Sequence, residues 1–429
     1  MDKLLLKEMV VEQRESLLKK EFGVEREWLS KVKKYVELPQ IVVISGLRRV
    51  GKSTLLKQIM QKYYQNDGYY LNFEDERLLG FTSSDFNFLL EVFVELYGEK
   101  KTFFFDEIQN IPKWELFVRR MHDRGYKIFI TGSNASLLSR EIGTRLTGRY
   151  LPVQLFPFSF KEYLLFKDEQ VDDQTFLKTS ARGRLKKHFG QYLLWGGMPE
   201  YLKYKNIDLL KSVYEDILYR DIVARYEIKE VRILRELGLY FMSNTGALFS
   251  YNRLKQSLGL GSINTAKSYT DHLENSYLFY AVNQFSFSLK KQIQNAKKAY
   301  VIDNGILEAV AFQFSQNRGK YLENLVFVEL KRRNLDVFYY KTSGGFEVDF
   351  AVKKGKKIVE LVQVASSLSN KNVKEREVRA LLEASKELKT KNMLILTEED
   401  EGIIKAKGLE IEMKPVYKWL CEASGREKP

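Results

Sequence analysis

The chain has 429 residues, of which 44% are hydrophobic, so it is long enough for two to four globular domains. The sequence contains no run of 18 apolar residues, so it predicts no membrane span. The charged N-terminus does not resemble a signal peptide, and the single cysteine, Cys421, excludes an intramolecular disulfide. These features predict a cytoplasmic protein, and three histidines with one cysteine do not support a structural zinc site.

The net charge of +14 is unevenly distributed along the chain. Residues 1–160 hold 25 Lys and Arg against 21 Asp and Glu, which leaves an excess of +10 for residues 161–429. Such an excess favours a polyanionic partner for the C-terminal two thirds of the chain. The alternative is a solvated surface rich in Lys and Glu, as in many thermophile proteins.

The most informative stretch follows two helices expected over residues 1–38. An apolar strand at residues 41–45 leads into the pattern G-x-x-x-x-G-K-S, and an amphipathic helix continues to about residue 64. This order of strand, loop and helix is the context that a phosphate-binding loop requires. The residues expected to bind ATP are Gly46, Leu47, Arg48, Arg49, Val50, Gly51, Lys52, Ser53 and Thr54.

The residue types in this loop have physical reasons. Gly46 and Gly51 allow the backbone conformations that turn successive N–H groups towards a phosphate. Lys52 supplies positive charge to the β- and γ-phosphates, and the Ser53 hydroxyl is a ligand for Mg²⁺. The helices before the loop either cover the adenine, with Gln13 and Arg14 near the base, or serve as plain packing helices.

A strand at residues 69–73 and a helix at 84–97 precede an apolar strand that ends in Asp106 and Glu107. In nucleotide hydrolases with such a phosphate-binding loop, the first acid holds Mg²⁺ through water and the second polarises the attacking water. We therefore expect Asp106 at the metal and Glu107 as the catalytic carboxylate.

A fourth strand at 127–131 is followed by Ser133 and Asn134, either of which could touch the γ-phosphate or align the attacking water. The alternative role for these residues is to cap the next helix. With a fifth strand at 150–155, strands alternate with helices, which predicts a parallel sheet covered on both faces.

Five motifs together resemble the archaeal and bacterial ATPases of the AAA+ superfamily that carry a winged helix and a nuclease-like domain after the ATPase. The motifs are Gly46-Leu-Arg-Arg-Val-Gly-Lys-Ser53, Phe105-Asp-Glu-Ile-Gln109, Thr131-Gly-Ser-Asn134, Leu146-Thr-Gly-Arg149 and Phe156-Pro-Phe-Ser-Phe-Lys-Glu162. The resemblance implies the roles given above for Lys52, Asp106 and Glu107 and a sensor role for Ser133 or Asn134. It makes Arg149 a candidate arginine finger, acting within one chain or across a homo-oligomer, although an ion pair unrelated to phosphate is the alternative.

The expected organisation is an ATPase domain at 1–160, a helical linker at 161–230, a winged helix-turn-helix at 231–295 and a nuclease-like α/β domain at 296–429. The linker contains Arg220, which could reach the nucleotide or form a surface salt bridge. In the winged helix, residues 263–275 are the candidate recognition helix. Its polar positions are Asn264, Thr265, Lys267, Ser268 and Tyr269. Winged helices also serve as protein-contact modules, so a protein partner stays open.

The last domain resembles the PD-(D/E)-x-K nuclease fold, which implies Asp349 and Glu360 as ligands of Mg²⁺. The lysine of that pattern is missing. If Glu360 is the second acid, Val362 occupies the lysine position; if Gln363 takes that place, Ala365 occupies it. Lys341 or Lys356 could substitute from elsewhere, but a fold kept for binding rather than cleavage fits these departures better.

We therefore expect an Mg²⁺-dependent ATPase that couples its nucleotide state to DNA engagement by the C-terminal domains. One alternative is a nucleotide-dependent switch that binds a protein partner. A second alternative is a metal-dependent DNA nuclease regulated by ATP.

Overall fold

The computed structural model describes residues 2–133, 146, 148–312 and 318–422. The chain divides into two compact units, Met1–Phe156 and Pro157–Pro429, which are described separately. Within the described ranges, no helix is both long and apolar enough to cross a membrane.

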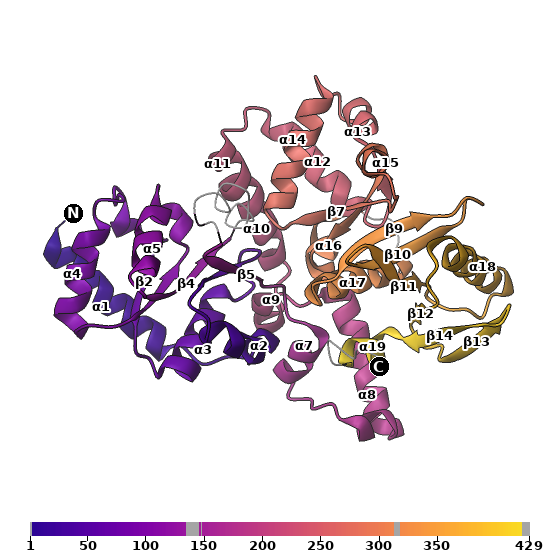
Figure 1. Cartoon of the computed structure of the whole chain (residues 1–429), viewed down its shortest axis with the longest axis horizontal. Helices are drawn as coiled ribbons and strands as arrows, with labels where there is room; N and C mark the ends of the chain where they lie inside the picture. Colours follow the sequence, from indigo (N-terminus) through magenta and orange to yellow (C-terminus); the bar gives the residue numbers. More distant parts are fainter. Residues whose placement is uncertain (1, 134–145, 147, 313–317, 423–429) are drawn as a thin grey trace. The chain divides into compact units, whose positions relative to one another are not determined.

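Unit 1 is a parallel α/β domain, as the sequence predicts (Figure 1). Its five strands lie in the order β2-β3-β4-β1-β5, and every neighbouring pair is parallel. The strands are β1 (Ile41–Ser45), β2 (Tyr69–Asn72), β3 (Thr102–Asp106), β4 (Lys127–Gly132) and β5 (Tyr150–Gln154). The helices are α1 (Lys3–Lys19), α2 (Glu27–Val36), α3 (Lys52–Tyr64), α4 (Phe86–Tyr97) and α5 (Trp114–Asp123), with short 3-10 turns at Glu76–Leu78 and Ile108–Asn110.

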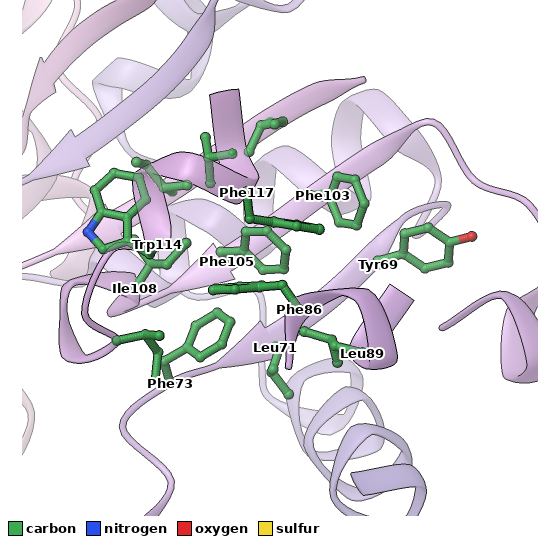
Figure 2. Packing of buried hydrophobic residues seen from close by; sticks show 14 of the residues in the cluster. Tyr69, Leu71, Phe73, Phe86, Leu89, Phe103, Phe105, Ile108, Trp114 and Phe117 are labelled. Atoms are coloured by element: carbon green, nitrogen blue, oxygen red, sulfur yellow. The ribbon is translucent and has the colours of Figure 1, made fainter. Parts of the chain in front are cut away.

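Aromatic side chains fill both faces of this sheet, which explains the unbroken apolar runs of its strands. On one face, Phe103 and Phe105 of β3 meet Phe86 of α4 and Phe117 of α5, whose rings stack 4.5 Å apart (Figure 2). On the other face, Phe104 lies against Tyr64 of α3, at 5.4 Å between ring centroids. Packing on both faces fixes the strands, and with them the loops at their carboxyl ends.

Unit 2 begins with helices and continues into two sheets (Figure 1). The first helices are α7 (Phe160–Phe166), α8 (Thr179–Trp195), α9 (Pro199–Tyr204), α10 (Asp208–Asp216) and α11 (Ala224–Tyr226), with a 3-10 turn at Asp173–Phe176. A π-helix, Ile217–Val223, joins α10 to α11 and contains the exposed Arg220.

A three-stranded antiparallel sheet of order β6-β8-β7 follows. Its elements are α12 (Val231–Ser243), β6 (Leu248–Phe249), α13 (Tyr251–Ser257), α14 (Ile263–Asn275), β7 (Phe279–Asn283), α15 (Leu289–Gln294) and β8 (Lys297–Val301). Ser250 caps α13 by accepting a hydrogen bond from the Arg253 amide.

The last sheet has six strands in the order β13-β14-β12-β11-β10-β9. Its elements are α16 (Asn304–Val310), α17 (Arg318–Arg332), β9 (Asp336–Lys341), β10 (Glu347–Lys354), β11 (Lys357–Val364), α18 (Lys371–Leu388), β12 (Met393–Thr397), β13 (Gly402–Ala406), β14 (Leu409–Pro415) and α19 (Val416–Cys421). Strands β9, β10 and β11 are antiparallel neighbours, whereas β12 is parallel to both β11 and β14. The sequence did not predict β13, β14 or α19.

Close backbone contacts in unit 2 explain why glycine occupies two of its positions. A Cβ at Gly197 would lie 2.2 Å from the carbonyl oxygen of Phe158, and one at Gly305 would lie 2.2 Å from that of Trp195. The buried Asp303 carboxylate caps α16 by accepting from the Gly305 amide, and it also accepts from the Gly197 amide at 2.7 Å. Burial raises the pKa of Asp303 to about 6, although these amide bonds oppose the shift.

Gly305→Ala should destabilise the protein by about 2 kcal/mol or more, because the added methyl group meets backbone that cannot turn away. Gly190→Ala is the matched control: it lies inside α8, and no neighbouring atom is within 4 Å of an added Cβ. The control should stabilise by up to about 1 kcal/mol through helix propensity. Denaturant unfolding measures both changes, and equal stability of the two variants would contradict the close contact.

Candidate functional site

The predicted phosphate-binding loop connects β1 to α3 through a tight backbone path. A Cβ at Gly46 would lie 2.2 Å from the carbonyl oxygen of Leu155, so only glycine fits beside β5. Gly51 adopts φ 95° and precedes α3, which begins at Lys52. The helix N-terminus, with its free N–H groups, therefore faces the loop.

Arg26 supports this loop from the segment before α2, a role that the sequence did not predict. Its buried guanidinium donates hydrogen bonds to the carbonyl oxygens of Val50 and Phe156, both at 2.7 Å. The first bond fixes the loop one residue before Gly51. No sequence pattern separates Arg26 from the other basic residues around it.

Lys52 is buried, and the loop surrounds its ammonium group. The Nζ atom donates to the carbonyl oxygens of Gly46 and Leu47, at 3.2 and 3.1 Å. It also lies 3.3 Å from Oε1 of Glu107. A cation held at the mouth of the loop by weak neutral acceptors and one carboxylate is well placed to pair with a phosphate instead.

Asp106 ends β3 with its carboxylate fully buried. It accepts hydrogen bonds from the hydroxyls of Ser53 and Thr131. Burial and the neighbouring charge of Glu107 raise the pKa of Asp106, although the two hydroxyls and Lys52 oppose the shift. The contact with Ser53 joins the two residues that the sequence assigns to Mg²⁺.

Glu107 adopts the left-handed conformation, with φ 49°, directly after β3. Its amide donates to Thr131 Oγ1 at 2.9 Å, and its carboxylate accepts from the Gln109 amide at 2.6 Å. Burial alone would raise the pKa of Glu107, but the Lys52 ammonium and the Gln109 amide lower it below its usual value. The carboxylate is therefore held ionised, as a group that accepts a proton from water must be.

Thr131 and Gln109 complete this site, and the sequence alone predicts a role for neither of them. Thr131 Oγ1 links the side chain of Asp106 to the backbone of Glu107. Both residues lie in motifs that carry the resemblance to AAA+ ATPases, but those motifs do not predict the contacts of the two side chains.

Ser133 follows β4 and is buried. Within the described residues its hydroxyl oxygen has no hydrogen-bond partner. Gly132 pairs with Ser45, the residue before the loop, so Ser133 lies at the carboxyl edge of the sheet beside the loop. Asn134, the other sensor candidate, lies outside the described residues.

Arg149 lies at the amino end of the strands, opposite to the loop, which does not favour contact with the nucleotide of its own chain. Its carbonyl oxygen accepts a hydrogen bond from the amide of Ile41, the first residue of β1. The phosphate-binding loop follows Ser45, the last residue of β1. The five residues of β1 span about 16 Å. The Arg149 side chain instead pairs with Asp123, at 2.9 Å from Nε to Oδ1.

Gln13 and Arg14 of α1 contact β2 and the turn before it, as the packing alternative describes. Gln13 accepts from the Asn72 amide at 2.7 Å and donates to the Asn72 carbonyl at 3.1 Å. Arg14 donates to the carbonyl oxygens of Gly68 and Asn66. The adenine role therefore has no support from these contacts.

Three of the five polar positions proposed on α14 are exposed: Asn264, Lys267 and Ser268. Tyr269 is buried in the domain, so it is not available to a groove. The hydroxyl of Thr265 contacts that of Ser262, which caps the helix. Next to α14 in sequence, the segment between β7 and β8 exposes apolar side chains.

The structure does not bring Glu360 to Asp349. Glu360 of β11 pairs with Val352 of β10, and Val362 pairs with Phe350, so Asp349 lies opposite Gln363, three residues beyond Glu360. At about 3.3 Å per residue this separation is roughly 10 Å, so these two carboxylates do not form one metal site. Across the described ranges, no group of three or more His, Cys, Asp or Glu residues could hold a metal ion.

The nucleotide site fits ATP with Mg²⁺ better than the C-terminal domain fits a metal. Its buried Lys52 faces the loop, the Ser53 hydroxyl touches the Asp106 carboxylate, and the Ser133 hydroxyl lacks a described partner. These groups match the donors and ligands that a phosphate and its cation require.

Comparison with protein families divides the chain into three matched regions. Residues 38–164 match an AAA domain, and this match contains the loop, Asp106, Glu107 and Thr131. Residues 186–317 match a domain of unknown function (DUF8612), and residues 318–414 match another (DUF4143).

Two relatives match most of the chain. The uncharacterized protein MJ1544 of Methanocaldococcus jannaschii is 38% identical over 398 residues, which cover 89% of this chain and 88% of the relative. An uncharacterized protein of Haemophilus influenzae is 33% identical over 353 residues, which cover 79% and 85%.

Solved structures match less closely. The Aeropyrum pernix Orc1 protein in complex with DNA is 10% identical, with a TM-score of 0.30 over 69% of this chain and 95% of that one, which is too low to support an inference. The identities of the two relatives are sufficient: the chain belongs to the family of these uncharacterized archaeal and bacterial proteins, and its N-terminal part is an AAA-type P-loop domain.

Proposed function

We propose that the chain binds ATP with Mg²⁺ and hydrolyses it. The observation that carries this proposal is the meeting of Lys52, Glu107 and the Ser53–Asp106 pair at one edge of a parallel sheet. Ligands of parallel α/β sheets bind at the carboxyl ends of the strands, which is where these residues lie.

Each residue has a separate part in this proposal. Lys52 leaves its loop carbonyls to pair with the phosphates, and the loop amides with the N-terminus of α3 hold the anion. Ser53 and Asp106 hold Mg²⁺, which, when bound, neutralises charge on the phosphates. Glu107 accepts a proton from the attacking water, and Thr131 keeps the two carboxylates in register.

Lys52→Ala should abolish ATP binding, whereas Glu107→Gln should keep binding and lose about 10²- to 10⁴-fold in turnover, because only the carboxylate acts on the water. Lys62→Ala is the control on the same helix, since Lys62 is exposed and pairs with Glu25. Nucleotide binding and phosphate release are measured separately for each variant. Undiminished hydrolysis by Glu107→Gln would overturn its role.

We further propose that Arg149 acts on the nucleotide of a neighbouring copy of the chain, because it lies a full strand length from its own loop. Its guanidinium is partly exposed and reaches Asp123 at the surface. An arginine finger supplied in trans stabilises the charge of the phosphoryl transition state.

Under this proposal the ATPase rate per chain should rise with protein concentration. Mixing Arg149→Ala with Lys52→Ala chains should restore part of the activity, because each supplies what the other lacks. Arg124→Ala, an exposed arginine at the end of α5, is the control. A rate per chain that stays constant from nanomolar to micromolar concentration, with a monomeric mass throughout, would contradict a nucleotide site shared between two chains.

We propose DNA as the partner of residues 231–295, taken as a winged helix. The order α12-β6-α13-α14-β7 supports this interpretation, and β8, which begins at Lys297 just beyond this range, completes a small antiparallel sheet with β6 and β7. The exposed Asn264, Lys267 and Ser268 on α14 and the excess of +10 in residues 161–429 support contact with phosphates.

Binding should be mostly independent of sequence, with dissociation constants on the order of 10⁻⁴ to 10⁻⁶ M near physiological salt. The logarithm of the association constant should fall with the logarithm of salt concentration by about 0.9 per neutralised phosphate. Lys267→Glu should weaken binding, whereas Lys371→Glu, the same change at an exposed site on α18, should not. Mobility shifts at several salt concentrations, with and without ATP, measure this.

A protein partner is the second candidate, and exposed apolar side chains favour it. Phe287, Leu289 and Ile293 are 82, 70 and 65% exposed, and α15 has no buried residue. A helix with its apolar positions in solvent is typical of a protein-contact surface. Undetectable DNA binding at low salt, in either nucleotide state, would remove the DNA proposal and leave this one.

A nuclease is the least supported alternative. Asp349 and Glu360 lie apart, and no residue at the lysine position of either register carries charge. We expect slow nicking or none with Mg²⁺ or Mn²⁺.

A further inference from the structure

Lys298 lies at the centre of a carboxylate cluster in the last domain. Its side chain comes from β8 and is 4% exposed. Its Nζ atom lies 2.8 Å from Glu347 Oε1 on β10, 3.0 Å from Glu323 Oε1 on α17 and 3.3 Å from Asp349 Oδ1 on β10. Three carboxylates from two elements therefore share one ammonium group.

This cluster contains Asp349. Of the two acids that the proposed nuclease-like fold assigns to Mg²⁺, Asp349 is the buried one. Its expected partner position is filled by Gln363, whose Oε1 accepts from the Asp349 amide at 3.2 Å. The Gln363 amide donates to Glu377 on α18. Both ends of Gln363 are thus used within the fold, so it does not act as the missing metal ligand.

The spacing of the cluster matches an ammonium group rather than Mg²⁺. Charge-assisted N–H···O bonds are about 2.7–2.9 Å long, whereas Mg²⁺ binds oxygen at about 2.0–2.1 Å. The three oxygen atoms stand 2.8–3.3 Å from Nζ. In addition, Glu323 Oε1 accepts from the Tyr300 hydroxyl at 2.6 Å, which holds that oxygen in place.

We propose that the Lys298 ammonium is the built-in cation of this cluster and keeps divalent metal out of it. The inference rests on the proposed nuclease-like fold of residues 296–429 and not on the ATPase site. The positive charge that a metal would bring is supplied by the chain, and the carboxylates stay paired without one. The domain therefore keeps its fold and loses the chemistry that depends on a metal.

Calorimetric titration of Ca²⁺ into the nucleotide-free full-length chain tests this proposal. Ca²⁺ is the probe because its oxygen ligands, at about 2.3–2.6 Å, require the smallest contraction of the cluster. Wild type and Asp349→Asn should give the same heats. Lys298→Ala should gain a site at least about tenfold tighter than any in wild type, because three carboxylates then lack a cation. Lys298→Ala/Asp349→Asn should lose that site.

Lys297→Ala is the matched control on the same strand, since Lys297 pairs with Asn283 at 2.5 Å and not with the cluster. It should gain no Ca²⁺ site. Ca²⁺ binding by wild type that Asp349→Asn abolishes would overturn the proposal, and so would a folded Lys298→Ala chain without a new site.

If Lys298→Ala unfolds without metal, its thermal midpoint with Ca²⁺ gives the answer: recovery supports the proposal, and no recovery contradicts it. ATP turnover of the same chains is recorded in parallel. Because that activity depends on unit 1, its presence or loss reports only on the ATPase proposal.

Discussion

The parallel alignment of five strands in unit 1 is the constraint on which the candidate site depends. Strand β1 lies between β4 and β5, and because the strands are parallel, their carboxyl ends all lie at the same end of the sheet. The loop leaves β1 there, Asp106 ends β3 there, and Ser133 follows β4 there. The same alignment places Arg149, which precedes β5, at the other edge. Strand direction therefore brings the loop, Asp106 and Ser133 of one chain together and places Arg149 of that chain a strand length away.

Two buried lysines show how charge is balanced in the two units. Lys52 is held by two loop carbonyls and one carboxylate, and a phosphate can replace these weak partners. Lys298 is held by three carboxylates, which no anionic ligand can replace. Removing either lysine would leave acids without their neutralising cation, which is costly. We infer that the first lysine is available to a ligand, whereas the second is committed to the fold.

The sequence predicts those features that rest on local pattern. The strand, loop and helix at residues 41–64, the two acids after β3 and the parallel sheet follow from periodicity and motif spacing. The helix at residues 263–275 follows from local pattern as well. The AAA match at residues 38–164 agrees with the predicted domain type.

Features that rest on contacts between distant segments were not predictable in this way. Arg26 reaches Val50 across 24 positions, and Lys298 reaches Asp349 across 51. Nothing in the residues around Arg26 or Lys298 marks them, because their roles arise only when strands and helices pack. The resemblance to the PD-(D/E)-x-K fold implies Glu360 as the partner of Asp349, but the register of β10 with β11 places Glu360 elsewhere.

The division of labour between Asp106 and Glu107 is the central claim, and the Mg²⁺ dependence of ATP hydrolysis tests it most directly. Initial rates are measured across a range of Mg²⁺ concentrations for wild type, Asp106→Asn and Glu107→Gln. We expect Asp106→Asn to raise the Mg²⁺ concentration needed for half-maximal rate, and Glu107→Gln to lower the maximal rate and leave that concentration unchanged. Equal shifts in both variants, or a wild-type chain that hydrolyses ATP equally well without Mg²⁺, would contradict it.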